Sequence, residues 1–359
     1  MSAPPIDAKV RRILVVNFGG IGDEILFFPV IRSLREAYPS AHLAALVEPR
    51  CEGIMRFNPA VDRTFTFEAK QRPSKRAFAE LVWRLRRERY DLVITAGSSP
   101  LMALLAWLTG APHRVGYAAH RWTRLLTQAV PLHKQQYAAH MYHDLVGWLG
   151  LPPLPPRMEV PEADVAWAQA FLASQGRDAG RRLVVLHPGV SRLSIEKRII
   201  KGWEPARWVD LGRRLTAEGH QVLLAGGPDD AEVMALIREA GDFPRLDAYG
   251  ATKSLGQLAA LLQLADVIVA VDSAPMHVGV AVGTPTVAIF GPTDPAKLLP
   301  PETPHTAVVR AGLACRPCLW DRRQTSCDAL TCLQEIGVED VATAVARTLA
   351  TTSSPGASL

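Results

Sequence analysis

Short apolar, β-branched runs alternate with amphipathic stretches along the chain, and no other feature of the sequence narrows the possible folds as much. In the front half this alternation predicts strands at 12–17, 42–47, 61–67 and 91–95, and helices at 24–38 and 74–89. Strands that alternate with helices are typical of a parallel sheet with crossover helices. The front half therefore predicts a Rossmann-like α/β domain.

The back half repeats the pattern after a proline-rich segment. It predicts strands at 182–186, 220–224, 267–271 and 286–290. It also predicts helices at 204–217, 229–240, 255–264 and 338–349, and one that starts at residue 275. Residues 151–161 hold five prolines, which remove backbone donors and indicate a linker. We expect domains at 1–155 and 156–345, then a helix end and disordered tail at 346–359. Two such sheets would face each other across a ligand-binding cleft.

Composition and charge limit the functional class. The 359 residues suffice for two domains, and 48% hydrophobic with 21% charged residues exclude extensive disorder. Residues 1–150 carry a net charge of +8 and the remainder −3, which suggests that the halves meet different partners. There is no secretory h-region and no uninterrupted apolar run of ~20 residues. We therefore expect a soluble, cytoplasmic protein, with peripheral membrane contact left open.

A glycine-rich turn, Gly19-Gly20-Ile21-Gly22-Asp23, follows the first predicted strand. Glycines before a helix allow close approach of an anionic group, although the third glycine of a dinucleotide fingerprint is missing. Asp23 would repel a pyrophosphate and suits a catalytic base facing the cleft. The alternative is that Asp23 is only the helix N-cap.

Loops of the back half meet at the same predicted sheet edge. Lys201 lies in a loop after His187-Pro188-Gly189 and is a candidate phosphate ligand, or else one of several solvated basic residues. Asp272 and Ser273 precede a helix whose first turn holds Pro275, and its free N–H groups can bind an anion. His277 has the alternative interpretation of a core histidine.

Two further features admit more than one interpretation. The cysteines Cys315, Cys318, Cys327 and Cys332 have the pattern C-x2-C-x8-C-x4-C, which fits a structural metal such as zinc or plain thiols in a reducing compartment. The basic amphipathic helix at 74–89 fits an anionic membrane surface, or a helix whose apolar face belongs to the core.

The chain resembles glycosyltransferase family 9, the ADP-heptose:lipopolysaccharide heptosyltransferases. The resemblance is carried by RILVVNFGGIGDEILFFPVIRSLREAYP, HPG followed by KGW, AGGPDD, and VDSAPMHVGVAVGTPTVAIFGPTDP, in the family's order across about 11–345. It implies a GT-B fold and a metal-independent, inverting transfer of a sugar. The implied donor is a nucleotide sugar such as ADP-heptose, and the implied acceptor is a lipopolysaccharide core or related anionic glycan.

The resemblance also implies roles for individual residues. Asp23 becomes the general base, and Lys201 binds the donor phosphates and stabilises the leaving diphosphate. Further substrate-binding positions are Gly20, Gly22, Asp229, Lys253, Asp272, Ser273, Ala274, Met276 and His277. The loop at 191–200 and Ala274 depart from the family pattern, so the sugar and the nucleotide base can differ from ADP-heptose.

Other function classes remain as alternatives. A nucleotide-sugar epimerase could use a similar two-domain architecture, and a binding protein could use the cysteine segment to hold a metal. No segment resembles a nucleic-acid-binding module, so no nucleic-acid partner is expected. An acceptor of this family would place the protein at the cytoplasmic face of the inner membrane.

Overall fold

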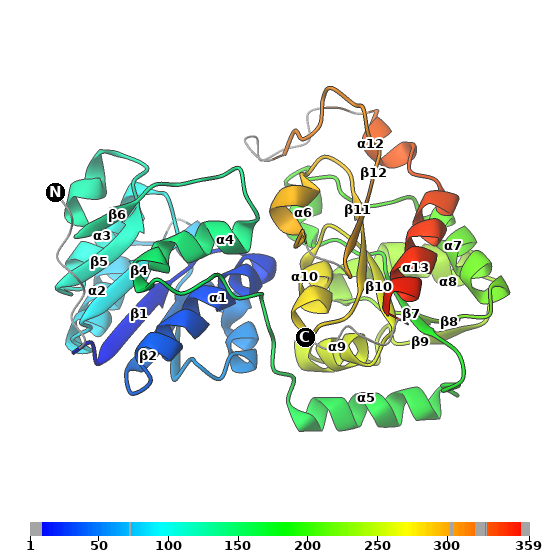
Figure 1. Ribbon diagram of the computed structural model, residues 1–359, viewed down its shortest axis with the longest axis horizontal. Coiled ribbons are helices and arrows are strands. Elements are labelled where there is room, and N and C mark those ends of the chain that lie inside the picture. The colour runs from blue at the N-terminus through cyan, green and yellow to red at the C-terminus, as the bar shows by residue number, and fades with distance from the viewer. Residues whose placement is uncertain (1–8, 72, 302–303, 320–326, 328, 353–359) are drawn as a thin grey trace. The chain divides into compact units, whose positions relative to one another are not determined.

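The chain forms two compact units in a computed structural model that describes residues 9–71, 73–301, 304–319, 327 and 329–352. Unit 1 is Met1–Glu159 and unit 2 is Val160–Leu359 (Figure 1). The division falls inside the proline-rich segment, at 159/160 where the sequence suggested 155/156. The tail predicted to be disordered lies, from residue 353 on, outside the described residues.

Unit 1 is built on a six-stranded parallel sheet. Its strands are β1 (Arg12–Val16), β2 (His42–Val47), β3 (Arg63–Thr66), β4 (Leu92–Thr95), β5 (His113–Tyr117) and β6 (Gln128–Val130). They lie in the order β3-β2-β1-β4-β5-β6, which is the doubly wound Rossmann order. The order reverses between β1 and β4, and this switch point is where such sheets bind ligands.

Helices cover both faces of this sheet. They are α1 (Ile21–Ala37), α2 (Lys75–Arg87), α3 (Pro100–Leu108) and α4 (Ala138–His143), with 3-10 turns η1 (Pro49–Phe57), η2 (Ala69–Gln71), η3 (Arg121–Leu125) and η4 (Asp144–Leu149). Leu81 of α2 and Leu105 of α3 share one core cluster with Leu14 of β1. The helices α2 and α3 therefore lie on one face of the sheet, while α1 packs against α4 (Figure 1).

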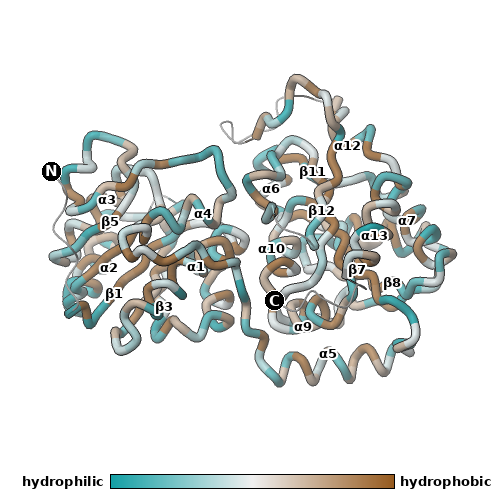
Figure 2. The backbone as a smooth tube through the Cα atoms, viewed as in Figure 1, coloured by the Kyte–Doolittle hydropathy of each residue, from teal (hydrophilic) through white to brown (hydrophobic). Residues whose placement is uncertain are grey.

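Unit 2 repeats the same topology. Its strands are β7 (Leu183–His187), β8 (Gln221–Leu224), β9 (Arg245–Asp247), β10 (Val267–Val271), β11 (Thr286–Phe290) and β12 (Thr306–Val309), in the order β12-β11-β10-β7-β8-β9. Counted from β7, this is again the Rossmann order, with its switch point between β7 and β10. Figure 2 shows hydrophobic residues gathered on the strands, and every side chain of β10 is buried.

The helices of unit 2 follow the strands in alternation. They are α5 (Glu162–Ser174), α6 (Arg192–Glu196), α7 (Pro205–Ala217), α8 (Ala231–Ala240), α9 (Leu255–Gln263), α10 (Ala274–Ala281), α11 (Pro295–Leu298), α12 (Thr331–Gln334) and α13 (Val338–Thr352), with a 3-10 turn η5 (Pro228–Asp230). Over the residues described, no helix has both the length and the apolar character needed to span a bilayer.

The predicted α/β alternation is confirmed in both units, with some corrections. The bounds of β2, β10 and β11 match the prediction. The helix expected from residue 24 begins at Ile21, because Gly20 caps it. The helix expected from 229 begins at Ala231, because Pro228–Asp230 form a separate turn. The sequence did not predict the strands β5, β6, β9 and β12 or the helices α3, α4, α5, α6, α11 and α12.

Candidate active site

The switch point of each sheet carries residues that the sequence singled out. In unit 1 the glycine-rich turn and Asp23 follow β1. In unit 2 His187 ends β7, and Asp272 directly follows β10. Both sets therefore lie at the carboxyl ends of strands where α/β sheets bind ligands. The two sets belong to different units and are described separately.

The turn after β1 holds Asp23 in a defined place with its carboxylate exposed. Its Oδ2 accepts a hydrogen bond from the backbone N–H of Gly20 at 2.7 Å. A Cβ added to Gly19 would lie 2.2 Å from the Asp23 Cβ, so only glycine fits there. The N-cap of α1 is Gly20 and Asp23 is its third residue, so the interpretation of Asp23 as the N-cap is wrong. Gly22 lies in the first turn of the helix.

Two residues that sequence reasoning missed lie against Asp23. The hydroxyl of Tyr142 on α4 lies 3.4 Å from Asp23 Oδ1, a long hydrogen bond. Burial raises the pKa of Tyr142 well above its ordinary value, and the charge of Asp23 adds to this. The tyrosine therefore stays protonated and can only donate to the carboxylate. No motif in the sequence connects residue 142 with residue 23.

The second missed residue is Glu24, the neighbour of Asp23 in α1. Its side chain is fully buried, and neither carboxyl oxygen has a hydrogen-bond partner among the described residues. Burial raises the pKa of Glu24 well above its ordinary value, and the charge of Asp23 raises it further. Burial thus favours the protonated form of Glu24, which lies behind the exposed carboxylate of Asp23. A signal was present in the sequence, since a charged residue stands within the apolar helix face.

In unit 2 the structure brings together Lys201 and Asp272, which are far apart in the sequence. Lys201 Nζ lies 2.7 Å from Asp272 Oδ2, and the Thr293 hydroxyl donates to the same oxygen at 2.7 Å. Burial alone would raise the pKa of Asp272, but Lys201, Thr293 and His277 together lower it below its ordinary value. The carboxylate is therefore held as an anion.

This arrangement changes the interpretation of both residues. Only 20% of the Lys201 side chain and 4% of the Asp272 side chain are exposed, so Lys201 is not a freely solvated residue. Thr293 was not predicted, although its motif GPTDP stands at the end of β11. A pocket beside this group is lined by Thr293, Asp294, Pro295, Arg310, Ala311, Gly312, Leu313, Arg316 and Pro317.

The start of α10 next to Asp272 is a candidate anion site. Ser273 is its N-cap, and its buried Oγ has no hydrogen-bond partner among the residues that the structure describes. Ala274 is the first residue of the helix and carries no large side chain; because Pro275 has no N–H and the Met276 N–H donates to the Ser273 carbonyl at 3.1 Å, the N–H offered to an anion in the first turn is that of Ala274. Met276 is wholly buried, and His277 is 7% exposed near Asp272.

Two more predicted residues lie on neighbouring loops. The carboxylate of Asp229 accepts a hydrogen bond from the backbone N–H of Arg192 at 3.0 Å. The ammonium group of Lys253 donates to the carbonyl of Gly250 at the turn before α9. Both residues therefore stabilise the conformation of loops at this end of unit 2. Their proposed contact with the nucleoside stays a prediction.

Asp230, the neighbour of Asp229, has a structural role at the β7 edge. Its carboxyl group fills the space beside Gly189, where an added Cβ would lie 1.9 Å from Asp230 Cγ. Burial raises the pKa of Asp230 to about 6. The motifs HPG and GGPDD are thus packed against each other, which explains the glycine of HPG.

The four clustered cysteines do not form a ligand set in this structure. Cys332 is buried, Cys318 is partly buried, and Cys315 and Cys327 are exposed. Burial raises the pKa of Cys318, and the nearby Cys327 and Cys315 thiols add to this. Across the residues described, no three His, Cys, Asp or Glu side chains are grouped as metal ligands. A metal at this segment stays a prediction.

Comparison with known proteins gives a consistent result. Residues 78–328 match the sequence profile described as "Glycosyltransferase family 9 (heptosyltransferase)". Lipopolysaccharide heptosyltransferase 3 of Escherichia coli is 26% identical over 283 residues, which is 76% of this chain and 81% of that protein.

Solved structures agree at the level of the fold. A glycosyltransferase family 9 protein from Veillonella parvula superposes with a TM-score of 0.81 at 24% identity, covering 98% of this chain and 100% of that chain. The E. coli heptosyltransferase WaaC, solved with ADP-2-deoxy-2-fluoro heptose, has a TM-score of 0.66 at 21% identity, covering 95% and 100%. The predicted GT-B fold is confirmed by these neighbours and by the two six-stranded parallel sheets.

Proposed function

Since this chain belongs to glycosyltransferase family 9 and is a glycosyltransferase, we propose that it transfers heptose from ADP-heptose to a lipopolysaccharide core or related glycan. The names of its relatives support this choice of sugar and acceptor. The observation that carries the proposal is the Lys201–Asp272 pair at the start of α10, a place suited to a diphosphate.

In the proposed reaction, Asp23 is the general base. An acceptor hydroxyl attacks the anomeric carbon of the donor, and its proton passes to the exposed Asp23 carboxylate. The new C–O bond forms as the bond from the anomeric carbon to the diphosphate oxygen breaks. That bond's electron pair leaves with the nucleoside diphosphate. A single displacement of this kind inverts the anomeric configuration.

The negative charge that develops on the leaving group is met by Lys201 and the backbone N–H of Ala274 at the start of α10. A fixed cation and backbone dipoles stabilise such charge without reorganisation during the reaction. Asp272 acts as a positioning residue, because its buried carboxylate holds the Lys201 ammonium at 2.7 Å. We propose that these groups serve in place of a divalent metal ion.

The remaining predicted residues have supporting roles. Gly20 and Gly22 allow the acceptor to approach Asp23, and Ser273 and Ala274 allow the diphosphate to approach α10. Asp229 and Lys253 are proposed to lie near the nucleoside, with Met276 supporting the wall of the site from the core and His277 beside Asp272. The loop at 191–200, which contains α6, is a place where donor specificity can differ from that of relatives.

We also propose that unit 1 binds the acceptor and unit 2 the nucleotide sugar. The excess of positive charge over residues 1–150 suits a phosphorylated glycolipid or polysaccharide. Such an acceptor would place the protein in the cytoplasm, at the inner membrane surface.

The experiment that tests the function is product analysis with ADP-heptose and a lipopolysaccharide acceptor that lacks the terminal heptose. We expect a mass increase of one heptose on the acceptor, release of ADP, inverted anomeric configuration by NMR, and unchanged turnover in EDTA. Retained configuration or loss of turnover in EDTA would reject the corresponding part of the mechanism. Failure of every nucleotide sugar in a panel to be consumed would reject transfer itself.

The epimerase alternative is tested by incubating the protein with donor alone. Rearrangement of the sugar without an acceptor would favour it over transfer.

A structural zinc at the cysteine segment is a separate proposal, tested by metal analysis of protein purified from medium containing zinc. A metal-to-protein ratio near zero would reject it.

A further inference from the structure

Three tryptophans that the proposed chemistry does not use stand exposed on unit 1. Trp83, Trp107 and Trp122 are 59%, 50% and 37% exposed. The described part of the chain has only two other large apolar side chains that are strongly exposed, Ile195 and Leu236 of unit 2. Exposed aromatic rings are unfavourable in water, so three of them on neighbouring elements indicate an interaction surface.

The three tryptophans come from elements that lie together. Trp83 belongs to α2, Trp107 to α3 and Trp122 to η3. Since α2 and α3 cover the same face of the sheet, their outward sides form one layer. The turn η3 packs against α3.

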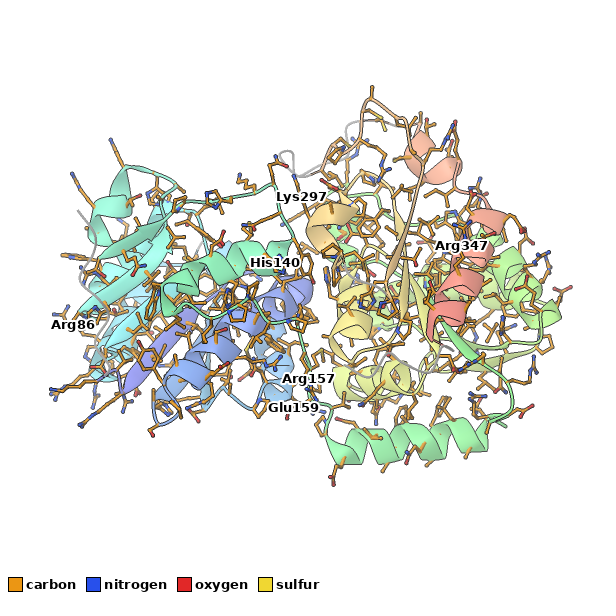
Figure 3. The ribbon with its side chains drawn as sticks, in the orientation of Figure 1. Arg86, His140, Arg157, Glu159, Lys297 and Arg347 are labelled. Carbon is orange, nitrogen blue, oxygen red and sulfur yellow. The ribbon has the colours of Figure 1, made fainter. Side chains whose placement is uncertain are left out.

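Contacts at the end of α3 connect it to α2 and to η3. The Arg86 guanidinium carbon of α2 lies 3.8 Å from the place a Cβ would take at Gly110, just after α3. Arg114 donates from Nε to the carbonyl of Leu125 at 2.8 Å and from Nη1 to the carbonyl of Ala111. It therefore joins the end of η3 to the end of α3. Figure 3 shows Arg86 at the outer edge of unit 1.

The same surface is strongly positive. Residues 100–125, which include α3 and η3, contain no Asp or Glu, and Arg121 and Arg124 belong to η3. The exposed basic residues of α2 are Lys75, Arg76, Arg84, Arg86 and Arg87, and the helix has one exposed acid, Glu80, which pairs with Arg76 at 2.8 Å. The guanidinium of Arg87 lies 4.6 Å from the centre of the Trp83 ring, so a positive charge and an exposed aromatic ring are in direct contact on this surface.

We propose that this tryptophan–arginine surface, formed by α2, α3 and η3, docks unit 1 on a bilayer that contains anionic phospholipid. Indole rings favour the headgroup region, where their apolar body and polar N–H are both satisfied. Arginines bind lipid phosphates, and each basic residue near an anionic surface adds attraction. The apolar side of α2, with Leu81 and Leu85, belongs to the core. The contact is therefore shallow, with side chains rather than the helix entering the interface.

This inference goes beyond the proposed transfer, because docking needs neither donor nor acceptor. The test is flotation of the full chain with vesicles of phosphatidylcholine, or of phosphatidylcholine with about one-third phosphatidylglycerol. We expect binding to the anionic vesicles only, weakened by added salt. Binding to neither kind, or equal binding to both, would overturn the proposal.

Matched variants assign the binding to this surface. The triple variant W83A/W107A/W122A should bind anionic vesicles roughly tenfold or more weakly, and R84Q/R87Q should weaken binding roughly fivefold for each arginine. The control I195A/L236A, which removes the exposed apolar side chains of unit 2, should bind as the wild type does. Wild-type binding by the triple variant would overturn the proposal.

Two further readouts distinguish docking through this surface from misfolding of the variant and from attraction to any polyanion. The triple variant should still unfold in one cooperative thermal transition, at a somewhat lower temperature because Trp122 is only 37% exposed, and its turnover on a water-soluble acceptor fragment should be unchanged. A duplex oligonucleotide serves as a polyanion without lipid. If it binds the wild type as tightly as the anionic vesicles do, and binds the triple variant with the same affinity, the surface responds to charge alone. That result would also overturn the proposal.

Discussion

The two units have the same strand order, yet they use an aspartate at the switch point in opposite ways. Asp23 in unit 1 is exposed and accepts one backbone hydrogen bond on one oxygen. Asp272 in unit 2 is 4% exposed and is held by Lys201 and Thr293. An exposed carboxylate can accept a proton from a substrate, whereas a buried and paired one cannot do so without losing its partners. Topology thus sets the place of a site, and local burial sets its chemistry.

The largest effect expected from this comparison is on Asp23. Asp23→Asn should lower kcat by roughly 10²–10⁴, because the base is lost while the size and the contact with Gly20 are kept. ADP binding, measured by calorimetry, should be unchanged. Glu80→Gln is a matched control, since Glu80 is an exposed acid of unit 1 on α2. If Asp23→Asn turns over like Glu80→Gln, Asp23 is not the base.

Removing Lys201, the partner of Asp272, should lower stability in addition to the turnover that its proposed role at the donor phosphates supports. Lys201→Met leaves a buried carboxylate without its cation, which we expect to cost about 3 kcal/mol at neutral pH. Folding lowers the pKa of Asp272 below its ordinary value of 3.8. The Lys201–Asp272 pair therefore stabilises the protein fully above pH 3.8, and this stabilisation is lost as the pH falls through the lowered pKa. Denaturant titration should show the difference between variant and wild type shrinking in acid. A constant difference would mean that the pair does not titrate as described.

Gly19 offers a way to displace Asp23 without changing it. The methyl group of Gly19→Ala would collide with the Asp23 Cβ, so the carboxylate must move, and we expect roughly a hundredfold loss of turnover. Gly53→Ala is the control, because nothing lies within 4 Å of an added Cβ there. Turnover is measured with both substrates at saturation. Equal activity of the two variants would show that the position of Asp23 is not critical.

Glu24 gives a smaller, pH-dependent effect. Its pKa is raised on folding, so the folded state binds more protons and wild-type stability falls as the pH rises above the ordinary value of 4.5. Glu24→Gln removes this slope, which is at most ~1.4 kcal/mol per pH unit. The variant should gain stability relative to the wild type as the pH rises above 4.5 in denaturant titrations. A pH-independent difference would mean that the pKa of Glu24 is not raised on folding.

The smallest expected effect concerns the charge of the two halves. Residues 1–150 carry +8 and the rest −3, so salt should raise the KM of an anionic acceptor more steeply than the KM of the donor. The measurement is a pair of steady-state titrations from low to physiological ionic strength. Equal salt dependence would leave the charge asymmetry without a role in binding.

The sequence predicted the fold and the places of the two sites, since strand periodicity and glycine turns are local signals. The turn around Asp23 and the helix start at Asp272 were both found in this way. What it could not predict were contacts between distant residues. Tyr142 beside Asp23 and Thr293 beside Asp272 depend on how helices and loops pack, which no local pattern records. The raised pKa of Glu24 depends on complete burial, which only the packed structure shows.

The central claim is that the exposed aspartate does chemistry and the buried aspartate supports the donor site. The most direct test measures single-turnover rate and ADP affinity for Asp23→Asn and Asp272→Asn side by side. We predict that Asp23→Asn binds ADP as the wild type does but loses at least a hundredfold in rate, while Asp272→Asn binds ADP more weakly and unfolds more easily. A wild-type single-turnover rate in Asp23→Asn, with the loss of chemistry found only in Asp272→Asn, would contradict it.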